Sequence, residues 1–143
     1  MEPRWINREV CLAVHDMLLS QYGGCSGLRD SGLLDSSLAR PLQMMAYGSP
    51  GLTELAAAYA AGIIKNHPFI DGNKRTGFML GSGFLELNGL EFFASEADAV
   101  IKTLALAAGE MTEGAYAEWL EKNSRGKAFK DRRNLQMGRL DFG

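Results

Sequence analysis

The chain has 143 residues, of which 46% are hydrophobic and 22% charged, and its formal net charge is −2. This length and composition are typical of a single globular domain, and they exclude a disordered tail, a collagen-like fibre and a disulfide scaffold. The charge is uneven: residues 1–123 contain nine Lys and Arg against fifteen Asp and Glu, whereas residues 124–143 contain six against two. We therefore expect a domain at 1–123 with no general attraction for nucleic acid, and a basic tail at 124–143. A solvated end is the simpler interpretation of the tail, and contact with RNA or an acidic partner is the alternative.

The first two predicted elements are helices separated by a glycine-rich loop. Asn7 can cap the first helix, which ends at Gly23-Gly24 and whose apolar face is formed by Val10, Val14, Met17 and Leu18. Ser31 or Asp35 can cap the second helix, and Pro41 marks either its start or a kink.

The middle of the chain predicts two longer helices that flank a short loop. A Gly and Pro cluster at 48–51 ends the second helix, and the alanine-rich segment 53–66 predicts a third. Residues 67–72 contain Pro68 and Gly72 and are expected to form a loop. A fourth helix is predicted from Asn73 to the Asn88-Gly89 pair.

The fourth helix carries Gly77 and Gly81 four residues apart, which predicts close approach by the backbone of another helix. Two further helices are predicted over 95–108 and 112–123, with Ser95 and Thr112 as N-caps. A short two-stranded element around 91–93 is left open. The fold expected is all-α: a single-domain bundle of about six helices, with the loop 67–72 before a central helix.

The cellular compartment is predicted from what the sequence lacks. No apolar run reaches the roughly 18 residues that cross a bilayer, and the start of the chain does not have the pattern of a signal peptide. Cys11 and Cys25 fit no metal-binding spacing. We therefore expect a cytoplasmic protein with reduced thiols and no membrane association.

One segment carries residues suited to chemistry: His67-Pro68-Phe69-Ile70-Asp71-Gly72-Asn73-Lys74-Arg75. If Asn73 begins a helix, the backbone N–H groups of Gly72, Asn73 and Lys74 face outward at the positive end of the helix dipole and form an anion site. Lys74 and Arg75 add full positive charges, and Arg75 can bind phosphate oxygens with both arms of its guanidinium group.

The same segment supplies a base and a metal ligand. Asp71 offers carboxylate oxygens suited to Mg²⁺ shared with phosphates. A histidine titrates near neutral pH, so His67 can accept a hydroxyl proton. Phosphate-transfer chemistry requires this combination of base, cation and phosphate-binding groups, because it depends on positioning and charge stabilisation.

This segment resembles the signature of the Fic/Doc (Fido) family, His-x-Phe-x-(Asp/Glu/Asn)-(Gly/Ala)-Asn-(Gly/Lys)-Arg, at every defined position. The stretch 27–35, with Leu38-Ala39-Arg40-Pro41 after it, resembles what death-on-curing proteins carry upstream of that signature. The similarity covers about residues 5–123, leaves the basic tail outside, and implies the family's all-α fold.

The resemblance implies a role for each matching residue. His67 would be the general base for a Ser, Thr or Tyr hydroxyl of a target protein, and Asp71 would hold Mg²⁺. Gly72, Asn73, Lys74 and Arg75 would bind the phosphates of ATP. Phe69 would be a buried anchor of the loop.

The resemblance also implies a biological setting and a reaction. Lys74, together with Phe78 in place of a second Arg, is similar to the Doc branch, which moves the terminal phosphate of ATP onto a protein hydroxyl. That branch consists of toxins that an antitoxin inhibits in trans, and a translation factor is among the conceivable targets.

The segment Ser82 to Glu86 is followed by Leu87 and does not fit the inhibitory helix that some relatives carry in cis. Transfer of AMP is the first alternative, and a non-catalytic nucleotide-binding module is the second.

Other readings of individual residues are weaker. A zinc site at His67 and Asp71 would lack ligands, since the other histidine is His15, which is expected to be a packed or capping residue. Arg29, Asp30 and Arg40 are expected to be solvated or helix-capping residues, with a role near the nucleotide or a partner as the alternative. Trp5, Trp119 and the methionines at 44, 45, 79 and 111 are predicted to belong to the core.

Overall fold

The structure is a computed structural model that describes residues 2–127. Within this range the chain forms six helices and two short strands, in the order α1 (Arg8–Tyr22), α2 (Ser31–Tyr47), α3 (Leu52–Asn66), α4 (Asn73–Leu87), β1 (Leu90–Phe92), α5 (Glu96–Ala107), α6 (Glu113–Lys122) and β2 (Ser124–Gly126). The predicted all-α fold with about six helices is confirmed. Among the helices of residues 2–127, none combines the length and the apolar character that crossing a membrane requires.

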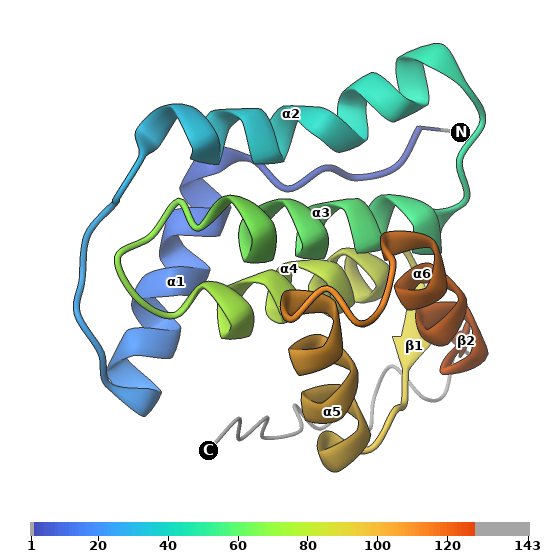
Figure 1. Ribbon diagram of the computed structural model, residues 1–143. Coiled ribbons are helices and arrows are strands. Elements are labelled where there is room, and N and C mark those ends of the chain that lie inside the picture. Colours follow the sequence, from blue (N-terminus) through green and yellow to red (C-terminus); the bar gives the residue numbers. More distant parts are fainter. Residues whose placement is uncertain (1, 128–143) are drawn as a thin grey trace.

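Helix α3 lies at the centre of the fold and is buried along nearly its whole length (Figure 1). It packs most extensively against α4, and also against α2 and α6. Its many alanines leave little side chain between the two helix backbones. A Cβ added at Gly77 of α4 would lie 2.9 Å from the carbonyl oxygen of Ala60, and one at Gly81 would lie 3.0 Å from that of Ala56. The predicted close approach at these two glycines is therefore confirmed, and α3 is the partner.

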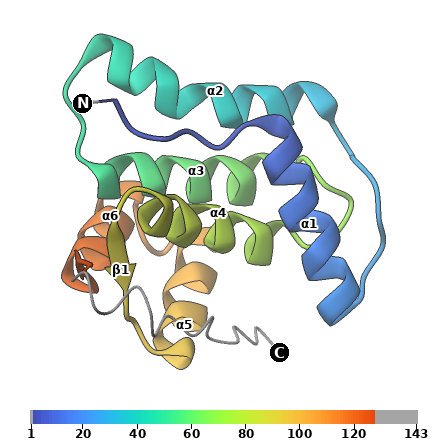
Figure 2. The ribbon, with the colours of Figure 1, turned by 180° about the vertical axis from the view of Figure 1, so that it is seen from behind.

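Helix α1 crosses the end of the α3–α4 pair where the loop 67–72 lies (Figures 1 and 2). Its predicted apolar face is wrong in part, because Val10 and Met17 are 47% and 40% exposed, whereas Cys11, His15 and Leu18 are buried. The buried face of α1 differs from the predicted face because it includes His15. A prediction from hydrophobic periodicity leaves out a buried polar residue of this kind. Burial raises the pKa of the Cys11 thiol to about 12, so this cysteine stays protonated at neutral pH.

Most of the predicted N-caps are confirmed: Asn7, Ser95 and Thr112 each accept a hydrogen bond from a backbone N–H of the first turn. The cap of α2 differs, because Asp30 accepts from the Leu33 N–H, rather than Ser31 or Asp35 acting as the cap. The N–H groups of Arg29 and Asp30 both donate to Pro68 O, which holds this segment extended and places the Asp30 carboxylate at the helix start.

Of the two alternatives predicted at Pro41, a helix start is wrong, since α2 starts at Ser31 and continues through Pro41 to Tyr47. Proline lacks the N–H that would bond to the carbonyl of Ser37, four residues earlier. The Ser37 backbone lies instead against Gly62 of α3, where an added Cβ would come within 3.5 Å of Ser37 O. Gly62 thus lets α3 approach α2 closely at Ser37, whose carbonyl lacks the intrahelical hydrogen bond that Pro41 cannot donate.

The short sheet left open by the sequence is present. Strands β1 and β2 pair antiparallel, with Glu91 opposite Arg125, and Arg125 forms an ion pair with Glu91. The first residues of the basic tail therefore pack against the domain. The expectations for the rest of the tail concern residues 128–143, which lie outside the described residues.

Candidate active site

The loop 67–72 joins the carboxyl end of α3 to the amino end of α4, at the end of the molecule that α1 covers (Figure 1). It opens into a pocket of about 380 Å³. Six residues of the predicted site line this pocket together: His67, Asp71, Gly72, Asn73, Lys74 and Arg75. The residues singled out from the sequence therefore converge on one cavity.

His67 has an unusual backbone conformation. It caps the end of α3 with φ 49° and ψ 56°, and its N–H donates to Ile63 O over 3.2 Å. Among residues 2–127 it is the one non-glycine residue with positive φ. This left-handed conformation costs an L-residue about 1–2 kcal/mol, and glycine is the usual residue at such a helix end. A strained histidine that lines a pocket is a candidate functional residue.

The loop is held by the side chains of Phe69, His15 and Asn73. Phe69 is buried, as the family resemblance implied, and its ring stacks on the imidazole of His15 with 3.7 Å between centroids. His15 Nε2 lies 2.8 Å from the carbonyl oxygen of Asp71. A carbonyl oxygen can only accept, so Nε2 donates this hydrogen bond. His15 is therefore a packed residue, as expected, and it holds the loop through its contacts with Phe69 and Asp71.

The side chain of Asn73 is used within the loop. Its Oδ1 accepts from the Phe69 N–H over 3.0 Å, and its Nδ2 donates to Phe69 O over 2.9 Å. The same Nδ2 lies 3.4 Å from Nδ1 of His67, at the long end of hydrogen-bond distances. Asn73 thus links the loop to α4 and touches the His67 ring, and its contribution to an anion is limited to its backbone N–H.

Asp71 is exposed, and both of its carboxylate oxygens contact the backbone. Oδ1 accepts from the Gly72 N–H over 2.9 Å and Oδ2 from the Cys25 N–H over 3.2 Å. A Cβ added at Gly24, where φ is +121°, would lie 2.7 Å from Asp71 Oδ2, so only glycine fits there. The segment after α1 therefore orients the carboxylate.

The residues fit a hard cation only if other ligands complete its shell. Within residues 2–127 there is no group of three or more His, Cys, Asp or Glu side chains that could enclose a metal ion. Mg²⁺ is commonly bound by one or two carboxylates together with water and substrate phosphates. Asp71 beside an anion site matches that arrangement, because each of its oxygens retains a lone pair after accepting one backbone bond.

The start of α4 has the geometry of an anion site. Gly72 adopts φ 80° and ψ 18° and offers no side-chain cap, so the first N–H groups of α4 lack intrahelical acceptors beside the pocket that Asn73, Lys74 and Arg75 line. The Gly72 N–H, which was predicted to join them, donates to Asp71 Oδ1 instead. The Arg75 guanidinium lies over the Tyr22 ring, 4.1 Å from its centroid. Arg75 Nε is buried and has no hydrogen-bond partner among the described residues. A bound phosphate would satisfy this donor.

Several residues of the site were not predicted from the sequence. Tyr22 is the last residue of α1, and Val100, Thr103 and Leu104 belong to α5, which forms the opposite wall of the pocket. No sequence motif identifies these four residues, because their position at the site depends on how α1 and α5 pack against the loop. Arg29 was expected to be a solvated or capping residue, with a role near the nucleotide or a partner as the alternative, and its guanidinium contacts the loop backbone.

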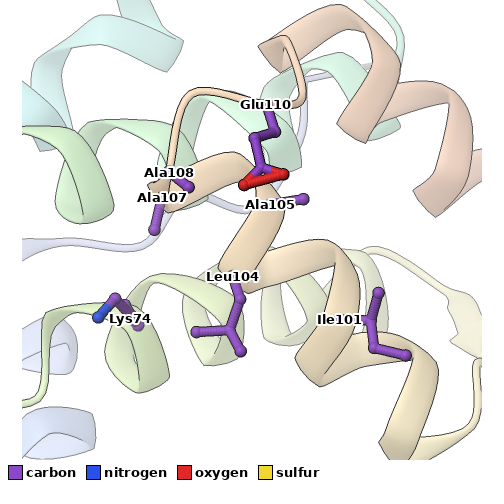
Figure 3. Close-up of a pocket in the computed structure, with 7 residues that line it drawn as sticks. All are labelled: Lys74, Ile101, Leu104, Ala105, Ala107, Ala108 and Glu110. Carbon is purple, nitrogen blue, oxygen red and sulfur yellow. The ribbon is translucent and has the colours of Figure 1, made fainter.

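A second hollow of about 590 Å³ adjoins the pocket and shares Lys74 and Leu104 with it. Figure 3 shows Lys74 on α4, opposite Ile101 and Leu104 of α5, with Glu110 beyond the end of α5. Ile101 and Leu104 are 60% and 48% exposed. The exposed Lys74 therefore stands at the boundary between a charged pocket and a more apolar groove.

Phe78, three residues after Arg75, does not face the pocket. It is 1% exposed, and its ring meets that of Phe92 edge to face with 5.9 Å between centroids. Position 78 is thus part of the core, and Arg75 is the arginine that α4 places at the pocket.

Comparison with known proteins agrees with this geometry. Residues 5–85, more than half of the chain, match the Fic/DOC family. The chain is 33% identical over 120 residues to the protein named "Protein kinase doc" of Escherichia phage P1, which covers 83% of this chain and 94% of that protein. It is 42% identical over 76 residues to "Toxin Doc" of Mycolicibacterium smegmatis, covering 51% of this chain and 58% of that protein. The loop, the anion site and the sequence matches together show that the chain belongs to the Fic/DOC family.

Proposed function

We propose that this protein is a cytoplasmic toxin that transfers the γ-phosphate of ATP to a Ser, Thr or Tyr hydroxyl of a target protein, and that an antitoxin holds it in check. The observation that carries the proposal is the convergence of His67, Asp71 and Arg75 on one pocket at a helix N-terminus. The names of the two similar proteins, a kinase and a toxin, support the two halves of the proposal.

The proposed reaction is an in-line displacement. The hydroxyl oxygen of the target forms a bond to the γ-phosphorus, while the bond from that phosphorus to the bridging oxygen breaks and the electron pair leaves with ADP. His67 accepts the hydroxyl proton as the new bond forms. The N–H groups at the start of α4 and the Arg75 guanidinium hold the phosphates. Mg²⁺, when bound at Asp71, neutralises phosphate charge.

Lys74 and Phe78 favour transfer of phosphate over transfer of AMP. A lysine at position 74 fills space that glycine would leave open beside the anion site, and it adds a charge at the mouth of the pocket. Phe78 is buried in the core, so α4 offers no second arginine at that position to hold the phosphates in another orientation. Because in-line attack requires the reacting atoms about 3–3.5 Å apart, the orientation of the nucleotide decides which phosphorus reacts.

The test is to incubate the protein with a bacterial lysate and either γ-labelled or α-labelled ATP, and to identify the labelled proteins by mass spectrometry. We expect label from the γ-phosphate, an added mass of one phosphate on a hydroxyl residue, and no labelling by a His67→Ala variant. Label from the α-phosphate alone would replace phosphate transfer with AMP transfer. ATP binding without any labelling would favour the third possibility, a non-catalytic nucleotide-binding module.

Replacing Asp71 with Asn should raise the Mg²⁺ concentration needed for half-maximal transfer. An amide is a weaker ligand for a hard cation than a carboxylate, and it removes a negative charge beside the phosphates. The measurement is a Mg²⁺ titration of the transfer rate at saturating ATP. Asp35→Asn is the matched control, since Asp35 is exposed and pairs with Arg8 instead. An unchanged Mg²⁺ requirement in Asp71→Asn would remove this carboxylate from the metal site.

A further inference from the structure

The side chain of Arg29 contacts two successive backbone carbonyls at the point where α3 joins the loop. Its Nε donates to His67 O over 2.6 Å and its Nη2 donates to Asn66 O over 2.7 Å. These two carbonyls lie at the carboxyl end of α3, where helix carbonyls lack intrahelical partners and the helix dipole is negative. A guanidinium fork is suited to two such acceptors at once. We propose that Arg29 is the positioning residue that holds His67 in its left-handed conformation, an inference that rests on the proposed role of His67 as the base.

The segment around Arg29 is itself fixed to the loop. The Arg29 N–H donates to Pro68 O over 2.7 Å, and the Ile70 N–H donates to Gly27 O over 3.1 Å. Leu28 and Phe69 form an antiparallel bridge between these bonds. The backbone of residues 27–30 thus runs beside the loop 67–70, and these bonds place the Arg29 guanidinium next to the two carbonyls independently of its side-chain contacts.

The need for such a contact follows from the strain at His67. A left-handed histidine persists only where the surroundings determine its backbone, because the conformation costs about 1–2 kcal/mol. On its amino side the His67 N–H is bound to Ile63 O. On its carboxyl side, the carbonyl oxygen of His67 accepts a hydrogen bond from Arg29 Nε. The two bonds together define both ends of the residue and therefore the direction of its side chain.

Arg29 differs from the arginine proposed to bind phosphate. Both of its bonds go to protein carbonyls at the end of α3, whereas Arg75 Nε is buried without a partner in the described residues. Arg29 is also exposed, so its replacement removes little from the core. Its loss should therefore affect the position of His67 more than the affinity for nucleotide or the stability of the fold.

The test compares Arg29→Met, which has no donor, with Arg29→Lys, which keeps one charged donor. The control is Arg40→Met, because Arg40 forms its own two-armed pair with Glu113 of α6. Two quantities are measured for each: kcat and KM of ATP-dependent transfer, and the intraresidue NOE between the amide and α protons of His67, which is strong only when φ is positive. The NOE is read on the full chain and does not depend on any transfer activity.

We expect kcat of Arg29→Met to fall about 10- to 100-fold, as for other misplaced catalytic groups, with KM for ATP little changed. The His67 NOE should weaken in Arg29→Met, be intermediate in Arg29→Lys, and be unchanged in Arg40→Met. An unchanged NOE in Arg29→Met would overturn the proposal, and so would a raised KM for ATP with normal kcat, since that would place Arg29 at the nucleotide. If the wild-type protein transfers nothing, the proposed function fails, and the NOE still decides whether Arg29 holds His67.

Discussion

Replacing His67 with Ala is expected to reduce the transfer rate by about 10²–10⁴-fold, the usual cost of removing a positioned base. Binding of ATP should be retained, because the phosphates are proposed to contact the start of α4 and Arg75 rather than the imidazole. The fold should be retained as well, since the ring projects from a loop into an open pocket. The measurement is single-turnover transfer at saturating ATP, with nucleotide affinity measured separately by calorimetry. A variant with near-normal transfer would show that His67 is not the base.

The same position allows a second comparison that separates chemistry from stability. His67 adopts φ 49°, a conformation in which glycine is about 1–2 kcal/mol more favourable than alanine. His67→Gly should therefore be as inactive as His67→Ala and yet unfold at a higher denaturant concentration. Equal stability of the two variants would mean that the left-handed conformation relaxes once the imidazole is gone. The expected result would show that the histidine is kept at a cost to stability.

The parts of the fold that depend on neighbouring residues were predictable from the sequence. The side chains of Asn7, Ser95 and Thr112 cap the helices that follow them, because an N-cap needs only its own first turn. The loop between α3 and α4 follows from Pro68 and Gly72 for the same reason. The residues of the candidate site were found because they are contiguous: the end of one helix and the start of the next place them around a single pocket.

The parts that depend on tertiary contacts were not predictable. Ser31 or Asp35 was predicted to cap α2, but Asp30 does so, because its N–H donates to Pro68 O of another segment and its backbone is thereby held extended. The face of α1 was predicted incorrectly because His15 is buried to support the loop, and hydrophobic periodicity treats it as polar. Tyr22 and Arg29 reach the site from α1 and from the segment after it. Their side chains are assigned a role only once the packing of those segments on the loop is known.

The close contact of α3 and α4 makes a further prediction with a large expected effect. At Gly77, a new Cβ would lie 2.9 Å from the carbonyl oxygen of Ala60 and 2.7 Å from Cγ1 of Ile64. The Ala60 carbonyl oxygen belongs to the backbone of α3, so no change of side-chain rotamer can relieve this contact. Gly77→Ala should therefore destabilise the protein by about 1–3 kcal/mol through overpacking, although alanine is the better helix former. Gly83→Ala on the same helix is the matched control: a Cβ there meets nothing within 4 Å, so this variant should gain about 0.5–1 kcal/mol. Denaturant unfolding measures both.

The substitution at Gly77 should also lower activity, and the reason lies in how the site is assembled. His67 follows the last residue of α3, whereas the anion site is the first turn of α4. The distance between base and phosphate is therefore set by how closely the two helices pack, and Gly77 lies one helical turn beyond the anion site. A displacement of α4 that relieves the clash with Ala60 O would move the phosphates away from His67, and a shift of about 1 Å can cost about 100-fold in rate.

We expect Gly77→Ala to lose kcat even under conditions where it is fully folded, and Gly83→Ala to keep it. Normal kcat in a destabilised Gly77→Ala protein would show that the clash is relieved elsewhere, by movement of the Ile64 side chain and of α3 away from the site.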